Sequence, residues 1–289
     1  MATLASTTVL QRKPRNIAVH TNPAHSLHLV EPEIPKPGPN ECLIHVRATG
    51  ICGSDVHFWK HGHIGEMVVC GENGLGHESA GSVIAVGSKV TRFKPGDNVA
   101  LECGIPCSKP SCDFCRTGQY NACPSVVFFS TPPYHGTLRR YHVHPEAWLH
   151  SLPDSMSFEE GSLLEPLSVA LAGIDRSNLR LGDPLVICGA GPIGLISLLA
   201  AHAAGAAPIV MTDIDESRLE RAREYMPRVR TVKVQKQDSA KDVAERVVDA
   251  LGCKAKLVLE CTGVESSIHT GIYVSWILKT AYRGRTRRC

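Results

Sequence analysis

Two groups of residues in the first half of the chain carry side chains that zinc prefers as ligands. The first group combines a thiol, an imidazole and a carboxylate, in Cys52, His77 and Glu78. Zinc accepts such mixed sets, and a catalytic zinc site keeps one coordination position open for water or substrate. Taken one at a time, however, these residues are more simply interpreted as a buried cysteine, a surface histidine and a solvated glutamate without a metal. The group therefore indicates a metal site only if the fold brings its members together.

The second group is a cluster of cysteines in a loop rich in proline, glycine and polar residues. Its members follow the spacing C-x4-C-x2-C-x7-C and are Cys107, Cys112, Cys115 and Cys123. Four thiolates suit a tetrahedral zinc ion with no open position, which would hold a loop that has little core of its own. A redox pair at Cys112 and Cys115 is the alternative, but it lacks the βαβ context that such motifs need. We therefore predict a structural zinc site.

A glycine-rich turn in the second half of the chain is typical of dinucleotide binding. It lies between an apolar run and a helix-like stretch and consists of Gly189, Ala190, Gly191, Pro192, Ile193 and Gly194. The glycines permit a tight turn and a close approach of the backbone to a pyrophosphate, and the start of the helix offers unpaired N–H groups. We therefore predict that this turn binds the cofactor.

Asp213 ends the next apolar run, about 20 residues further on, where a carboxylate accepts a hydrogen bond from a ribose 2′-hydroxyl. The same carboxylate would repel a 2′-phosphate, so NAD is favoured over NADP. Arg218 partly reopens this question, because it could stack on adenine or meet a phosphate.

The elements that must position these residues follow two different patterns. Short alternating runs broken by turns predict that the first half is all-β, with strands at residues 17–20, 42–49, 82–86, 98–101 and 138–143. After about Ser157, a helix-like stretch at 158–174 comes before a regular alternation. Its strands are predicted at 185–188, 209–212, 231–234 and 256–260, and its helices at 192–204, 216–225 and 239–251. This rhythm predicts a parallel, doubly wound sheet.

We therefore expect an α/β plus β fold class, with a zinc-binding β domain at 1–156 and an NAD-binding domain at 157–273. A six-stranded dinucleotide fold continues past its fourth strand with two more, and residues 274–289 do not match that continuation. This basic tail has the loss of periodicity expected of frame-shifted or non-coding sequence. We expect it to leave the edge of the fourth strand unpaired.

Composition narrows the classes of function. Apolar residues make up 43% and charged residues 20% of the chain, as in ordinary globular proteins. The net charge of +3 includes five positive charges after Tyr273, so the rest of the chain is net negative and a nucleic-acid partner is not supported. No export signal and no run of about 18 apolar residues is found, which predicts a cytoplasmic protein without a membrane partner. Twelve cysteines then favour thiols and metal ligands over disulfides.

In order and spacing, these motifs resemble the zinc-dependent medium-chain dehydrogenases, specifically the polyol branch that includes sorbitol, xylitol and L-arabinitol dehydrogenases. The resemblance runs from about Ile17 to Tyr273. Besides the four-cysteine loop and the glycine turn, the motifs that carry it are Gly50-Ile51-Cys52-Gly53-Ser54-Asp55, Gly76-His77-Glu78, Leu164-Glu165-Pro166-Leu167-Ser168 and Glu260-Cys261-Thr262-Gly263. Residues 107–112 and 128–136 look most like the fungal L-arabinitol 4-dehydrogenases.

The resemblance implies a chaperonin-10-like β domain followed by an incomplete Rossmann domain. It implies a catalytic zinc bound by Cys52, His77 and Glu78, with Glu165 as a nearby carboxylate that binds or exchanges with the zinc-bound water. The remaining roles that it implies are orientation of His77 by Asp55, a proton relay through Ser54 and His57, and cofactor binding by Thr262. For Ser54 and His57, a turn serine and a surface histidine remain the alternative.

The implied activity is NAD-linked oxidation of a secondary hydroxyl of a sugar alcohol, most closely L-arabinitol to L-xylulose in pentose catabolism. Zinc lowers the pKa of the hydroxyl, and the nicotinamide accepts the hydride. Sorbitol or xylitol oxidation is one alternative, and an inactive zinc-binding form of the chain is another. A zinc-free, quinone-reductase-like relative is disfavoured by the three candidate ligands. Family members are commonly tetramers, so a homo-oligomer is expected if the C-terminal region were present.

Overall fold

The structure is a computed structural model that describes residues 8–275 and 281–283. The described chain divides into two compact units, of which the first extends to Glu165 and the second begins at Pro166.

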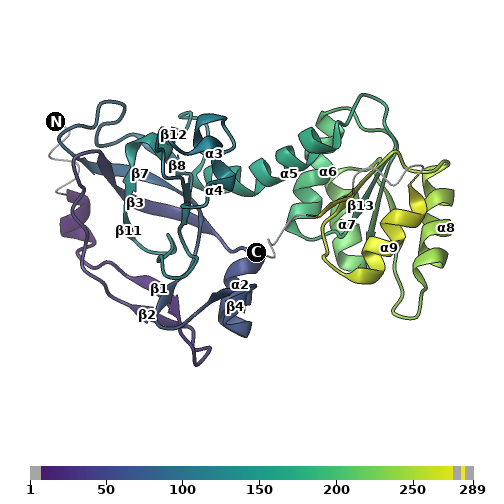
Figure 1. Ribbon diagram of the computed structural model, residues 1–289, viewed down its shortest axis with the longest axis horizontal. Helices are drawn as coiled ribbons and strands as arrows, with labels where there is room; N and C mark the ends of the chain where they lie inside the picture. The colour runs from purple at the N-terminus through teal and green to yellow at the C-terminus, as the bar shows by residue number, and fades with distance from the viewer. Residues whose placement is uncertain (1–7, 276–280, 284–289) are drawn as a thin grey trace. The chain divides into compact units, whose positions relative to one another are not determined.

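The first unit is built on an antiparallel sheet of five strands in the order β11-β3-β7-β8-β12 (Figure 1). These strands are β3 (Glu41–Gly50), β7 (Glu78–Val86), β8 (Asn98–Leu101), β11 (Tyr141–Pro145) and β12 (Leu149–Ser151). A second sheet has the order β2-β1-β6. Its strands are β1 (Ala18–Thr21), β2 (His28–Val30) and β6 (Asn73–Gly74). Two hairpins pair β4 (His63–Ile64) with β5 (Met67–Val68) and β9 (Gly104–Ile105) with β10 (Val127–Phe128).

Helical elements lie between these strands and after them. Between the strands are α2 (Gly53–His61), α3 (Asp113–Arg116) and the short 3-10 turns η1 (Tyr120–Ala122) and η2 (Glu146–Trp148). After β12 come α4 (Phe158–Ser162) and α5 (Leu164–Ser177), of which α5 continues into the second unit. Alternation along β3 explains the packing of the large sheet, because Cys42 and Ile44 join one buried cluster while Leu43 joins another.

The expectation of an all-β first half fails at residues 53–61, which form α2. Cys52 is the N-cap of this helix, and the Asp55 carboxylate accepts a hydrogen bond from the Cys52 N–H. The helix ends at Gly62, which has the left-handed φ of 71° that favours glycine. Only Asp55 and Phe58 are buried in it, so the sequence carries no apolar stripe that would have indicated a helix.

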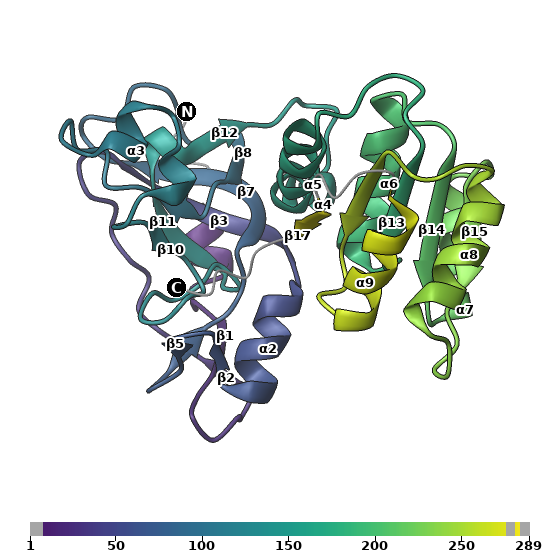
Figure 2. The same ribbon diagram turned by 45° about the vertical axis from the view of Figure 1, so that its right-hand side comes forward.

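The second unit has a parallel sheet in the order β15-β14-β13-β16-β17 (Figure 2). Its strands are β13 (Leu185–Cys188), β14 (Ile209–Asp213), β15 (Arg230–Lys233), β16 (Leu257–Glu260) and β17 (Ala281–Arg283). Its helices after α5 are α6 (Pro192–Ala203), α7 (Glu216–Tyr225), α8 (Ala240–Leu251) and α9 (Glu265–Val274).

Helices cover both faces of this parallel sheet. Leu185 and Ile187 of β13 join a buried cluster that includes residues of α5, α6 and α7, whereas Val186 and Cys188 face a cluster with residues of α8 and α9. Strands buried on both faces consist of continuous apolar residues, as β13 does. The predicted doubly wound parallel sheet is therefore confirmed.

The edge of the fourth predicted strand is paired, which corrects the expectation of an unpaired edge. Residues 281–283 form β17, and Val258, Leu259 and Glu260 of β16 are its register partners. Pairing requires only backbone N–H and C=O groups, so a short segment without an apolar pattern can satisfy the edge. The other residues of the predicted tail, except 274 and 275, lie outside the described residues.

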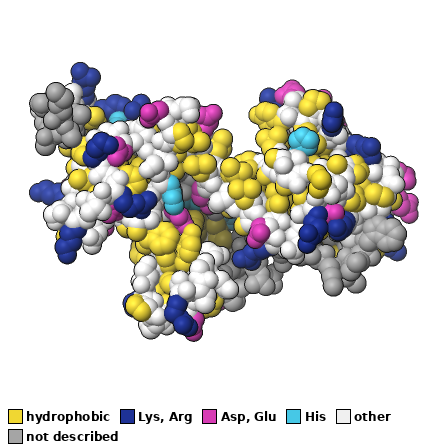
Figure 3. Space-filling view, turned by 90° about the horizontal axis from the view of Figure 1, so that it is seen from above, with side chains coloured by type: hydrophobic (Ala, Val, Ile, Leu, Met, Phe, Trp, Pro, Cys, Tyr) yellow, Lys and Arg dark blue, Asp and Glu magenta, His cyan; other side chains and the backbone are white. Residues whose placement is uncertain are grey.

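Charged side chains are dispersed on the face that Figure 3 shows, where Lys and Arg alternate with acidic and uncharged side chains. None of the helices in the described residues is both long enough and apolar enough to span a membrane.

Candidate active site

The structure brings together the three predicted ligands of the mixed site. One ligand atom each from Cys52, His77 and Glu78 lies within 4.8 Å of the others, and His77 and Glu78 are buried. Pairing of β3 with β7 places Gly50 opposite Glu78. A Cβ atom on Gly50 would lie 2.1 Å from the Glu78 Oε2 atom, so glycine is required here to leave room for the carboxylate.

Asp55 ties together the two chain segments that carry these ligands. Its Oδ2 atom accepts a hydrogen bond from the Cys52 N–H at 3.0 Å, and its Oδ1 atom accepts one from the Gly76 N–H at 2.8 Å. The Asp55 Oδ1 atom also lies 3.7 Å from the His77 Nδ1 atom, which is an ion-pair distance but too long for a direct hydrogen bond. Asp55 thus acts on His77 through its charge and through the backbone.

The hydrogen-bond partner of the His77 ring is Ser130, which sequence reasoning missed. The His77 Nδ1 and Ser130 Oγ atoms are 2.9 Å apart, and Ser130 is buried. Ser130 has a φ of 74°, a left-handed conformation that is uncommon for a non-glycine residue. The buried Asn73 side chain donates a hydrogen bond to the Ser130 carbonyl at 3.1 Å and helps to hold this conformation. The only sequence signal was that Ser130 lies inside the 128–136 motif.

The electrostatics of the group suit a divalent cation. Burial opposes protonation of His77, but Asp55 and Cys52 outweigh burial and raise the pKa of His77 to about 10. Burial raises the pKa of Glu78 and of Glu165. Among the described residues, no Lys or Arg forms an ion pair with Asp55 or Glu78. A bound dication would therefore offset the negative charge of these buried carboxylates, and the thiol, imidazole and carboxylate would serve as its ligands.

The three other residues predicted to act in catalysis lie on helices α2 and α5. Glu165 is in the first turn of α5, and its pKa is affected by the charges of His77 and Glu78, although its carboxylate is not part of the 4.8 Å group. Ser54 and His57 are three residues apart on α2, a spacing that places side chains on one face. The His57 ring packs 4.5 Å from the His61 ring, so the proton relay stays a prediction.

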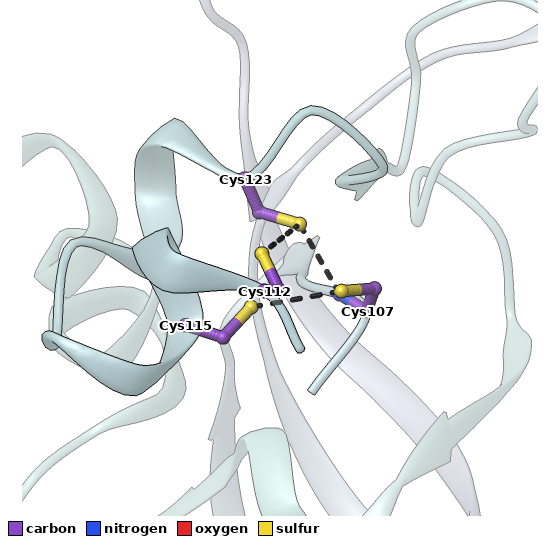
Figure 4. Close-up of side chains that lie close together, drawn as sticks. All are labelled: Cys107, Cys112, Cys115 and Cys123. Carbon is purple, nitrogen blue, oxygen red and sulfur yellow. Dashed lines mark hydrogen bonds between the residues drawn. The ribbon is translucent and has the colours of Figure 1, made fainter. Parts of the chain in front are cut away.

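The four predicted structural ligands also converge (Figure 4). The Sγ atoms of Cys107 and Cys115 are 3.8 Å apart, and those of Cys112 and Cys123 are 3.9 Å apart. A tetrahedron with Zn–S bonds of about 2.3 Å has sulfur atoms about 3.8 Å apart, whereas a disulfide needs about 2.05 Å. The Cys107 N–H donates to the Cys123 sulfur and is the main cause that lowers the pKa of Cys123 to about 7. These sulfur positions fit a metal ion and not a redox disulfide.

The predicted glycine turn connects β13 to α6. Gly189 has a left-handed φ of 100°, and a Cβ atom on Gly194 would lie 1.9 Å from the Gly189 carbonyl oxygen. At Gly191, by contrast, an added Cβ atom would meet no protein atom within 4 Å, so open space lies next to this backbone. Pro192 is the first residue of α6, where its missing N–H has no cost, and Ile193 follows it. This is the form expected of a turn that binds a pyrophosphate.

Two acidic residues, at the ends of the two strands that flank β13, support the glycine turn. The Asp213 Oδ2 atom accepts a hydrogen bond from the Ala190 N–H at 2.7 Å, and Arg218 approaches the same carboxylate at 3.9 Å. Glu260 accepts hydrogen bonds from the Thr262 N–H and hydroxyl, and a Cβ atom on Gly189 would lie 2.8 Å from the Thr262 methyl group. Asp213 and Thr262 therefore both border the turn.

Comparison with known proteins agrees with this geometry. Residues 38–154 match the alcohol dehydrogenase GroES-like domain. The chain is 54% identical to L-arabinitol 4-dehydrogenase of Aspergillus oryzae over 93% of this chain and 74% of that protein. It is 45% identical to sorbitol dehydrogenase of Bos taurus, over 91% of this chain and 73% of that protein.

Among solved structures, an oxidoreductase of unknown specificity from Escherichia coli has a TM-score of 0.81 and 36% identity, and the match covers 90% of this chain and 74% of that one. The chain thus spans about three quarters of the length of each of these proteins. Together, the GroES-like domain, the parallel sheet and the identity to polyol dehydrogenases show that the chain belongs to the polyol branch of the zinc-dependent medium-chain dehydrogenases.

Proposed function

We propose that the protein oxidises L-arabinitol to L-xylulose with NAD as the hydride acceptor. The observation that carries this proposal is the convergence of Cys52, His77 and Glu78 in a chain that is 54% identical to an L-arabinitol 4-dehydrogenase. When bound, zinc would supply a Lewis acid that lowers the pKa of a substrate hydroxyl, and NAD would supply the hydride acceptor.

The residues of the first unit hold and orient the groups that react. Cys52, His77 and Glu78 would hold the zinc ion, while Asp55 and Ser130 fix the backbone and the ring of His77. The geometry assigns the His77 Nδ1 atom to Ser130, which leaves Nε2 as the ring atom available to a metal.

The proton of the substrate hydroxyl must reach solvent. Ser54 is half-buried and His57 is exposed on the same face of α2, so we assign them a relay toward water. Glu165 would share this region as a carboxylate whose raised pKa makes proton exchange easier.

In the second unit, the glycine turn would hold the NAD pyrophosphate, and Asp213 would accept a hydrogen bond from the adenosine ribose. One Asp213 oxygen already accepts from Ala190 and the other from the Asp215 N–H. Each carboxylate oxygen has two lone pairs, so a ribose hydroxyl can still bind. A 2′-phosphate would meet this carboxylate at close range, which favours NAD.

Oxidation of sorbitol or xylitol is the second candidate, favoured by the 45% identity to a sorbitol dehydrogenase. Sorbitol is one carbon longer than L-arabinitol, and xylitol differs from L-arabinitol in the configuration of one carbon. A difference of one carbon is worth only about 1–3 kcal/mol in binding, so the three polyols must be compared directly. We would measure NADH formation by zinc-loaded protein with NAD and each of the three polyols. The expected result is the highest kcat/KM for L-arabinitol.

Two variants make this test sharper. Cys52→Ser should abolish turnover. Cys70→Ser should not, because Cys70 is an exposed thiol that belongs neither to the mixed site nor to the four-cysteine site. Turnover retained by Cys52→Ser would contradict the assigned zinc site. NADH binding with slow polyol turnover would indicate a damaged enzyme, whereas no NADH binding by the zinc-loaded protein would support the inactive zinc-binding form.

A further inference from the structure

A third group of potential metal ligands lies in the small sheet of the first unit, outside both sites described above. Antiparallel pairing of β1 with β2 places His20 directly opposite His28. Directly opposed residues have their side chains on the same face of a sheet. Glu72 comes immediately before β6, which pairs with the other side of β1. Three segments thus bring two imidazoles and one carboxylate to one place.

The Glu72 carboxylate lies between the two imidazoles. Its Oε2 atom is 2.9 Å from the His28 Nε2 atom and 3.4 Å from the His20 Nδ1 atom. Ligand atoms around a tetrahedral ion with bonds of about 2.0–2.1 Å are about 3.3 Å apart, close to both values. The two imidazoles are farther apart than the ligands of the other two groups, so binding requires His28, whose side chain is 32% exposed, to turn toward His20.

The two ring nitrogens of His20 are buried and have no hydrogen-bond partner among the described residues. Its side chain is only 8% exposed, and neither ring nitrogen makes a hydrogen bond of good geometry with the described residues. A buried polar atom without a partner is costly and calls for an explanation such as a bound ion. Burial and then the neighbouring His135 lower the pKa of His20, which keeps the ring neutral and its lone pair available.

The orientation of the His28 ring also suits a metal ligand. Its Nε2 atom lies 2.9 Å from the Glu72 carboxylate oxygen, and its Nδ1 atom lies 3.3 Å from the Ser26 carbonyl oxygen. Both partners can only accept, so in the neutral ring one of the two contacts lacks a proton. With a cation beside Nε2, the ring proton would lie on Nδ1 and be donated to the Ser26 carbonyl. Metal-binding histidines commonly donate their other ring N–H to a backbone carbonyl in this way.

His135 is a neighbour of this group but not a member. Its ring stacks on His20 with centroids 4.8 Å apart, and its Nδ1 atom accepts a hydrogen bond from the Gly74 N–H. That nitrogen is therefore occupied, and the ring serves to pack His20 in place. We propose that His20, His28 and Glu72 form a third metal site, which binds a borderline divalent cation such as Zn²⁺ through two imidazole nitrogens and one carboxylate.

The test is a count of bound zinc. The zinc-loaded full chain is dialysed against buffer with a fixed free Zn²⁺ concentration, and metal per chain is measured by mass spectrometry. The wild type should bind about one more zinc ion per chain than His28→Gln or Glu72→Gln. Both substitutions are at partly exposed side chains, so we expect the fold to be kept, and circular dichroism checks this.

A matched control is available in the same unit. The His150 Nε2 atom lies 2.8 Å from the Glu102 Oε2 atom, which makes a second histidine–carboxylate pair outside the proposed site. His150→Gln should therefore keep the additional zinc ion. The proposal is overturned if the wild type binds no zinc beyond the two other sites, in which case a proton bridges His28 and Glu72. It is also overturned if His28→Gln binds as much zinc as the wild type. Polyol turnover is a separate readout, so the failure of either proposal can be recognised.

Discussion

His77 has two neighbours at the same ring nitrogen, and they act in different ways. The Ser130 hydroxyl lies at hydrogen-bond distance and can accept the Nδ1 proton, which sets the tautomer. The Asp55 carboxylate lies 0.8 Å farther away from Nδ1, at 3.7 Å against 2.9 Å, and supplies charge without a direct bond. Orientation of the ring and its basicity are therefore controlled by separate residues.

Removal of the Ser130 hydroxyl should weaken zinc binding at the mixed site. Loss of a hydrogen bond to a ligating histidine typically costs about 10- to 100-fold in metal affinity, and we expect a loss in this range for Ser130→Ala. Chelator competition measures the affinity, and the spectrum of the cobalt-substituted protein reports the ligand geometry. Ser130→Gly is the informative companion, because it also lacks the hydroxyl but relieves the left-handed backbone. Equal affinity of the wild type and both variants would rule out the orienting role.

Substitution of Asp213 should change cofactor discrimination and loosen the glycine turn. Asp213→Ala removes the charge that would repel a 2′-phosphate, so the ratio of the NADPH and NADH dissociation constants should fall by about tenfold or more. It also leaves the buried Ala190 N–H unpaired, which costs about 1–3 kcal/mol in unfolding free energy. Quenching of cofactor fluorescence measures binding, and urea unfolding measures stability. An unchanged ratio of dissociation constants would contradict the assigned contact with ribose.

The metal-ligand residues could be predicted from the sequence, whereas the residue that orients the His77 ring could not. Cys52, His77 and Glu78 have side chains whose chemistry is evident from residue type, and a resemblance to a family grouped them. Ser130 is 53 positions from its partner, and a lone serine indicates nothing without the fold. Its role depends on a left-handed backbone conformation and on Asn73, neither of which leaves a pattern in the sequence.

Among the elements, strands and helices with a buried apolar pattern were the predictable ones. The predicted bounds of β13, β8 and α7 coincide with those in the structure, because apolar runs and a capping Asp215 define them. Helix α2 was missed because most of its residues are exposed and its start is set by the Cys52–Asp55 cap. Strand β17 was missed because its pairing depends on backbone groups of β16.

The loop that carries the four cysteines should depend on metal for its structure. Its longest helical element, α3, has four residues and no buried residue, so packing contributes little to its stability. Cys112→Ser should remove one metal ion per chain and lower the melting temperature, and cobalt substitution of the wild type should give the spectrum of a tetrathiolate site. Cys253→Ser, at an exposed thiol in the other unit, should change neither property. A Cys112–Cys115 disulfide that forms in zinc-loaded protein without loss of metal would contradict this assignment.

Across the described chain, the buried histidines are all in the first unit. They are His20, His45, His77, His142 and His144. Burial lowers the pKa of His45 and of His144 to about 4, and lowers that of His142 well below its usual value. The two units should therefore differ in their response to acid.

Acid should destabilise the protein through His45, His142 and His144, whose pKa values are lowered by burial. In the unfolded chain histidine has a pKa of about 6.5, above the folded values, so the unfolded state binds more protons between about pH 6.5 and 4. The contribution of these histidines to the free energy of unfolding is therefore fully present above about pH 6.5 and is lost as the pH falls from about 6.5 to 4. For His144 the loss at the lower end is on the order of 3 kcal/mol. Urea unfolding at several pH values measures this slope.

The variant His144→Gln isolates one of these titrations. A glutamine amide can still donate to the Trp148 carbonyl oxygen that lies 3.1 Å from the His144 Nε2 atom, but it takes up no proton. The variant should be somewhat less stable than the wild type at pH 7, because the side chain packs differently. Its stability should nevertheless fall less steeply with acid, with about one fewer proton taken up on unfolding. A damaged core alone would lower the stability at pH 7 without reducing its dependence on pH, so it would not reproduce this result. An unchanged dependence of stability on pH would show that His144 is protonated in the folded protein.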